Sequence, residues 1–153
     1  MKIVKLLLFE DVIPALSAET KEEVLRELAS GVAARHTGLA VEDLLRILLE
    51  REMLGSTGIG DGIAIPHGKL NKLEQPLMSF GRSLKGVDFN ALDGRKVSLF
   101  FLLLAPVGAE GMHLKMLARI SRILKDPAVR RELLAAPDAA VIVNILRVQD
   151  DRY

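Results

Sequence analysis

The segment from Val97 to Leu104 is a nearly continuous apolar run in which Ser98 is the single polar residue. A run of this length without polar alternation is typical of a β-strand that is buried on both faces of its sheet. The run ends at Ala105-Pro106, and patterns of helical spacing stand on both sides of it in the sequence. We therefore expect the chain to fold as one compact α/β unit.

Two helices are predicted in the first third of the chain. Thr20 and Glu23 have the spacing of a capping box, with a hydroxyl at the cap and a carboxylate three residues later. Apolar residues follow at helical spacing, so we expect a helix that ends near Gly38. A second helix is expected from about residue 41 to 54, with Gly55 as its stop.

Short strands and further helices complete the expected order. The expected strands are residues 12–16, 63–65, 77–84 and 97–104. Pro14 suits an edge position for the first of them. Residues 69–75 are polar and are expected to form a turn. A third helix is expected after a loop at 107–111, and Asp126-Pro127 marks the start of a fourth, which Pro137 closes.

The last segment, from Ala139 to Leu146, is compatible with two interpretations. The β-branched residues Val141, Ile142 and Val143 favour a strand. In contrast, Asp138 in a cap position and apolar residues at helical spacing favour a helix. We favour the helix.

The composition limits the classes of protein to which the chain can belong. Its 153 residues suffice for one domain of ordinary size, and we expect residues 1–153 to form a single domain. Half of the residues are hydrophobic but only 4% are aromatic, so the core should be aliphatic. The 21 basic and 20 acidic residues nearly cancel, which gives no strong field for nucleic acid. The absence of cysteine excludes disulfides, thiolate metal ligands and cysteine nucleophiles.

No segment has the pattern of a membrane span or of a secretion signal. The longest uninterrupted apolar run, from Leu99 to Val107, contains Pro106 and is far shorter than the roughly 20 residues that a spanning helix needs. Near the N-terminus, Lys5 interrupts the apolar run and Glu10-Asp11 ends it. We expect a cytoplasmic protein that is not embedded in a membrane.

Most of the candidate chemistry lies between Arg51 and Leu70, which hold five of the twelve glycines. His67 follows Pro66 and precedes Gly68, so its backbone is restricted on one side and free on the other. The short apolar segment before Pro66 is expected to be a buried strand that places the imidazole of His67 at the edge of the sheet.

The glycines of this segment allow several interpretations. A dinucleotide site needs G-x-G-x-x-G between a strand and a helix. This segment follows a helix, and only one residue separates Gly60 from Gly62 where the motif needs two. A P-loop fits poorly, because one residue too many precedes Gly68-Lys69 and Leu70 stands where a hydroxyl should bind magnesium. Two interpretations remain open: a tight turn, or exposed amides that form a concave anion site beside His67.

Two of the three histidines could act together. His36 ends a helix and is expected on the solvated surface. His67 and His113 are expected at the same edge of the sheet, and they converge if their strands are neighbours. A hydrolytic zinc site would need a third ligand, for which only Asp61 is placed. The segment also lacks the G-x-S-x-G pattern of a serine nucleophile. No metal or cofactor is therefore expected.

Phosphoryl transfer suits these residues best. A neutral imidazole can attack phosphorus and carry the phosphoryl group covalently. The product gains roughly −1.5 to −2 charges, so the site needs cations and hydrogen-bond donors. The residues that could supply them are Arg51, Lys69, His113, Ser56 and Thr57.

The sixteen residues from Gly55 to Leu70, GSTGIGDGIAIPHGKL, resemble the active-site motif of IIA domains in the bacterial phosphoenolpyruvate-dependent phosphotransferase system. The resemblance is to the fructose/mannitol class, and within it to the nitrogen-regulatory branch, and it extends over essentially the whole chain. It implies a phosphotransferase with a mixed β-sheet flanked by helices. Asp61 departs from the pattern, because members of this family often carry Asn or Glu there.

The resemblance also implies roles for individual residues. His67 matches the phosphoacceptor, which takes its phosphoryl group from a small HPr-like carrier. His113 matches the second active-site histidine, and Arg51 matches the arginine that neutralises the phosphate charge. The implied function is regulation through phosphorylation-dependent binding to downstream proteins. The alternative is sugar transport, in which the phosphate passes to a separate IIB protein, since this chain has no cysteine.

Overall fold

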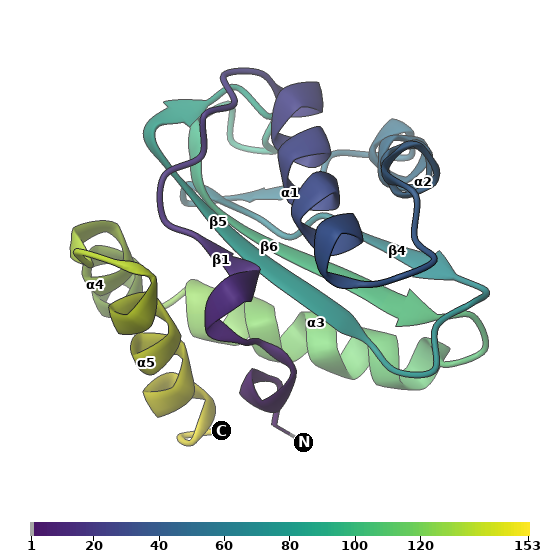
Figure 1. Cartoon of the computed structure of the whole chain (residues 1–153). Coiled ribbons are helices and arrows are strands. Elements are labelled where there is room, and N and C mark those ends of the chain that lie inside the picture. Colours follow the sequence, from purple (N-terminus) through teal and green to yellow (C-terminus); the bar gives the residue numbers. More distant parts are fainter. Residues whose placement is uncertain (1) are drawn as a thin grey trace.

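The computed structural model describes residues 2–153, which form one mixed β-sheet with helices on both faces (Figure 1). The strands are β1 (Val12–Ile13), β2 (Gly58–Gly60), β3 (Ile63–Ala64), β4 (His67–Leu70), β5 (Leu77–Val87) and β6 (Val97–Pro106). The α-helices are α1 (Lys21–Arg35), α2 (Val41–Met53), α3 (Glu110–Leu124), α4 (Pro127–Ala135) and α5 (Ala139–Asp150). Two short 3-10 helices, η1 (Val4–Leu6) and η2 (Phe9–Asp11), precede β1.

Strand β6 lies at the centre of the sheet. The strand order is β1-β5-β6-β3-β2, and β4 pairs with β6 beside β3. Strands β3 and β4 both run parallel to β6, with Ile63 opposite Leu99 and His67 opposite Leu103. They therefore follow one another along the same side of β6. Strand β2 pairs with β3 but not with β4.

The apolar run of β6 supplies both faces of the core. Phe101 and Leu103 pack in one apolar cluster with residues of α3, α4 and α5. Phe100 and Leu102 pack in a second cluster with residues of α1 and α2. In Figure 1, α1 and α2 accordingly lie on one side of the sheet and α3 lies on the other. The predicted α/β class and the predicted doubly buried strand are confirmed.

The predicted helix caps are also present. Thr20 accepts a hydrogen bond from the backbone N–H of Glu23, which completes the capping box of α1. Asp126 caps α4, and Asp138 caps α5 through the N–H of Val141. The last segment is therefore a helix, as favoured from the sequence. Within residues 2–153, none of the helices combines the length and the apolar character that crossing a membrane would need.

Two strands were not predicted, and both lie in the glycine-containing segment. Residues 58–60 form β2, and the expected turn at 69–75 is wrong at its start because Lys69 and Leu70 belong to β4. Glycine and lysine have low intrinsic preference for strands, so the local sequence carries little signal. Pairing with β3 and β6 overrides that preference.

Candidate active site

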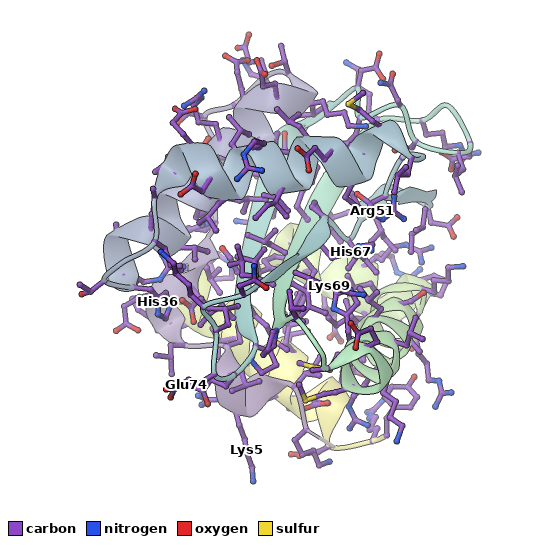
Figure 2. The ribbon with its side chains drawn as sticks, turned by 90° about the vertical axis from the view of Figure 1, so that its right-hand side faces the viewer. Lys5, His36, Arg51, His67, Lys69 and Glu74 are labelled. Carbon is purple, nitrogen blue, oxygen red and sulfur yellow. The ribbon has the colours of Figure 1, made fainter. Side chains whose placement is uncertain are left out.

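His67 is the first residue of β4, directly after the break between β3 and β4 at Ile65-Pro66. The carbonyl of Pro66 accepts a hydrogen bond from the N–H of Leu103, which ties the break to the central strand. Figure 2 shows Arg51, His67 and Lys69 one below another on the same side of the molecule. His36, at the end of α1, lies on the opposite side of that view.

The two ring nitrogens of His67 have different partners. Its Nδ1 lies 2.8 Å from the carbonyl oxygen of Ile65, and its Nε2 lies 3.2 Å from Nε of Arg51. A carbonyl oxygen can only accept and a guanidinium can only donate. The proton therefore resides on Nδ1, and Nε2 carries the lone pair, which accepts from Arg51. In this tautomer Nε2 is the ring nitrogen with a lone pair available for attack on an electrophile.

Arg51 is held in place by a second bond. It lies in the last turn of α2, and its Nη1 donates to the carbonyl oxygen of Gly55 over 2.9 Å. Gly55 has φ +145°, a conformation that L side chains rarely adopt. The turn after α2 thus fixes the guanidinium beside His67.

His113 lies in the first turn of α3 and is 5% exposed. Its ring centroid is 5.2 Å from that of His67, with the planes inclined by 52°. The two imidazoles therefore converge across the space between β4 and α3. Its Nδ1 is buried and has no hydrogen-bond partner among residues 2–153.

The surroundings keep both imidazoles neutral near pH 7. Burial, together with the nearby His67 and Lys69, lowers the pKa of His113 from 6.5 to about 4, although Glu110 works in the opposite direction. Burial also lowers the pKa of His67 below 6.5, although the Ile65 carbonyl works in the opposite direction. A neutral His67 has the lone pair that attack on phosphorus requires.

The hydroxyls of Ser56 and Thr57 are engaged within the protein. Thr57 is buried, and both its hydroxyl and its N–H donate to the Glu52 carboxylate. Ser56 donates to the carbonyl oxygen of Phe89 over 2.9 Å and accepts from the N–H of Gly58 over 3.0 Å. The N–H groups of Thr57 and Gly58 are therefore not available for a concave anion site.

Glu52 was not singled out from the sequence, yet it organises the start of this segment. It is 8% exposed and forms an ion pair with Lys21, at 3.0 Å, in addition to its bonds with Thr57. Lys21 belongs to α1, so no local spacing in the sequence reveals this pair.

Asp61 lies in the turn between β2 and β3, where it is exposed, and its N–H donates to Asp93. Its φ of +58° is in the left-handed region, which Asn and Asp tolerate better than other side chains. The residue therefore suits its backbone conformation. Within residues 2–153 there is no group of three His, Cys, Asp or Glu side chains that could hold a metal ion.

A cavity of about 400 Å³ opens over the two histidines. Its lining residues are Ile47, Glu50, Arg51, Leu54, His67, Gly68, Lys69, His113, Leu114 and Leu117. Leu54 and Leu114 are exposed by 84% and 67%, respectively. We call Leu54, Leu114, Ile47 and Leu117 the apolar rim. A partner that covered it could exclude water from the histidines.

Comparison with known proteins places these features in a family. Residues 5–148 match the family described as phosphoenolpyruvate-dependent sugar phosphotransferase system, EIIA 2. The chain is 46% identical over 146 residues to the nitrogen regulatory protein of Bradyrhizobium diazoefficiens, and the alignment covers 95% of each chain. It is 35% identical over 150 residues to the fructose-specific EIIABC component of Bacillus subtilis, which covers 98% of this chain and 24% of that protein.

The fold agrees with a solved structure as well. The crystal structure of the nitrogen regulatory protein IIA-Ntr from Neisseria meningitidis matches with a TM-score of 0.88 and 31% sequence identity. The match covers 94% of this chain and 97% of that one. The predicted family is thus confirmed: the chain belongs to the EIIA 2 family of the phosphoenolpyruvate-dependent sugar phosphotransferase system.

Proposed function

We propose that this protein accepts a phosphoryl group on Nε2 of His67 from a phosphohistidine on an HPr-like carrier. The observation that carries the proposal is the pair of bonds that holds His67 with its proton on Nδ1 and its lone pair on Nε2. In the transfer, Nε2 forms a bond to phosphorus while the bond to the carrier's imidazole breaks. The leaving imidazole takes that electron pair, and the Nδ1 proton stays on His67 beside the Ile65 carbonyl.

Arg51 and His113 have distinct roles in this proposal. Arg51 now donates to Nε2 of His67, and on phosphorylation it donates to the phosphoryl oxygens instead. A hydrogen bond between a charged donor and a charged acceptor is stronger than one between neutral groups. His113 is neutral and so has a single N–H. Because a buried N–H without a partner is more costly than a buried lone pair, we place its proton on Nε2, from which it donates to a phosphoryl oxygen.

Lys69 adds a second cation, since it follows His67 by two residues on the same strand and lines the cavity. Ser56 and Thr57 were expected to bind the phosphate, but their hydroxyls donate to the Phe89 carbonyl and to the Glu52 carboxylate, so we propose that they order the segment after α2 instead. The apolar rim is the proposed docking site for the carrier. No metal or other cofactor takes part.

We further propose that the protein is a nitrogen-type regulator whose phosphorylation state controls its binding to other proteins in the cytoplasm. The identity to the Bradyrhizobium nitrogen regulatory protein over nearly the full length of both chains supports this role. It also supports the view that residues 1–153 form a single domain of this type. We propose no binding to nucleic acid.

A sugar-transport role is the second candidate, and the similarity to the fructose-specific EIIABC component favours it. This chain has no cysteine, so the phosphoryl group would then pass to a separate IIB protein. Mixing the phosphorylated protein with a fructose-type IIB protein distinguishes the two roles. Rapid phosphorylation of the IIB cysteine supports transport, and its absence supports regulation.

The phosphoacceptor is tested by intact-mass analysis after incubation with phosphoenolpyruvate, Enzyme I and the carrier. We expect one phosphoryl adduct on the wild type and on the control variant His36→Ala, which alters a histidine outside the site. We expect none on His67→Ala and slower formation on His113→Ala. An unchanged adduct on His67→Ala would refute the assignment.

A further inference from the structure

Four side chains form two facing pairs, and three of the four line the cavity. His67 and Lys69 are two residues apart on β4, so their side chains point to the same side of the strand. Glu110 and His113 are three residues apart on α3 and share one face of that helix. His67 faces His113, and Lys69 faces Glu110, with Nζ and Oε1 3.8 Å apart.

Glu110 supplies a negative charge at this position. It lies in the first turn of α3, and its Oε1 accepts from the N–H of Gly108 over 3.3 Å. Backbone hydrogen bonds from Glu110 itself and from Gly108 lower the pKa of this carboxyl, so it stays ionised at neutral pH. The bond from Gly108 orients the carboxylate beside Lys69, while the Glu110 side chain is itself exposed.

Lys69 is the movable partner. Its side chain is 42% exposed, and the lysine stem has four rotatable bonds. Both charges act on His113: Lys69 lowers its pKa, and Glu110 raises it. A phosphoryl group on His67 would add roughly two negative charges near both residues. It would attract Lys69 and repel Glu110.

We propose that Glu110 is a positioning residue that competes with the phosphoryl group for Lys69 and thereby makes phosphorylated His67 a better donor. In the unphosphorylated protein Lys69 pairs with Glu110. In the phosphorylated protein Lys69 turns to the phosphoryl oxygens and leaves the Glu110 carboxylate unpaired. This inference rests on the proposed function, since it requires phosphate on His67.

The expected consequence is a shift in the transfer equilibrium. Glu110→Gln removes both the competitor and the repulsion, so Lys69 is free for the phosphate. We expect the ratio of phosphorylated to free protein, at a fixed ratio of phosphorylated to free carrier, to rise about threefold or more. The increase should shrink as salt is added, because both groups are exposed.

Three variants make the test specific. Lys69→Gln should lower the ratio, and Glu110→Gln should have a much smaller effect when Lys69 is already Gln, because the two residues act through one contact. Glu22→Gln is the matched control, since Glu22 is an exposed carboxylate in the first turn of α1. It changes the net charge equally and should leave the ratio unchanged.

The outcomes separate this inference from the proposed function. A wild-type protein that takes no phosphate from a competent carrier overturns both. If the wild type is phosphorylated and Glu110→Gln has the same ratio of phosphorylated to free protein as the wild type, only the role of Glu110 is overturned. An increase of that ratio in Glu22→Gln equal to the increase in Glu110→Gln overturns it as well.

An NMR titration needs no phosphate: the pKa of His113 should fall in Glu110→Gln and rise in Lys69→Gln. If the pKa of His113 is unchanged in both variants, the inference is overturned.

Discussion

The Nδ1 atom of His67 lies 2.8 Å from the carbonyl oxygen of Ile65, two residues earlier in the chain. Pro66, whose ring restricts its φ, lies between the two residues, at the break between β3 and β4. The backbone at this break thus determines which imidazole nitrogen carries the proton.

This contact predicts the tautomer of the unphosphorylated protein. At pH 7.5 the proton of His67 should reside on Nδ1, with Nε2 unprotonated. Long-range ¹H–¹⁵N correlation spectra of the histidine side chains measure this directly. A His67 ring with its proton on Nε2 would contradict the geometry, because Arg51 could then not donate to that atom.

Replacing Arg51 by lysine should slow phosphotransfer about tenfold or more while the fold is retained. Lysine keeps the charge but not the planar set of donors that reaches both His67 and the Gly55 carbonyl. The loss of one charged hydrogen bond, about 1.5 kcal/mol, corresponds to that factor.

The rate of adduct formation measures this effect, and Arg46→Lys on the same helix is the control. Arg46 pairs with Asp43 and Glu50 on the surface, so its variant should react at the wild-type rate. Equal rates for Arg51→Lys and Arg46→Lys would remove Arg51 from the mechanism.

Acid should weaken both reactivity and stability. The pKa of His67 lies below 6.5, so the phosphotransfer rate should be constant near pH 7 and fall as the pH drops through that lowered pKa.

The pKa of His113 is about 4 in the folded protein and near 6.5 when unfolded. Between these values the unfolded chain binds more protons, so folding stability decreases as the pH falls from 6.5 towards 4.

Urea unfolding of the wild type and of His113→Gln, at several pH values in that window, isolates the histidine from the other groups. The wild type should lose more stability than the variant over the same interval. Parallel losses in both proteins would show that His113 does not contribute the acid sensitivity.

The Glu52 carboxylate should be a major stabilising group. Glu52→Ala leaves the buried N–H of Thr57 without its acceptor and the partly buried Lys21 without its ion-pair partner, so we expect the free energy of unfolding to fall by about 2–3 kcal/mol. Glu42→Ala is the control, because Glu42 pairs with Arg26 on the surface and its loss should matter far less. Equal losses in the two variants would contradict the assigned role.

The parts of the structure that follow from local patterns were predictable. The run from Val97 to Leu104 indicated a strand buried on both faces, and Phe100 and Phe101 do pack in opposite clusters. Thr20 and Asp138 marked helix starts because capping is a contact between near neighbours in sequence. The resemblance of residues 55–70 supplied the family, which composition alone could not do.

Features that depend on distant residues were not predictable. Strand β4 forms because it pairs with β6, although Gly68 and Lys69 disfavour strands. The convergence of His67 and His113 was expected on the condition that their strands are neighbours, which periodicity alone does not reveal; the pairing of β4 with β6 meets that condition. Glu110 could have been noticed, since it stands one helical turn before His113, but its contact with Lys69 required the position of β4.

The central claim is that Nε2 of His67 carries the phosphoryl group. ³¹P NMR of the protein with ¹⁵N-labelled histidine, after incubation with phosphoenolpyruvate, Enzyme I and the carrier, tests it most directly. The account predicts one phosphoramidate signal, coupled to Nε2 of His67 and absent from His67→Ala. A signal on Nδ1 or on another histidine, or no signal with a competent carrier, would contradict it.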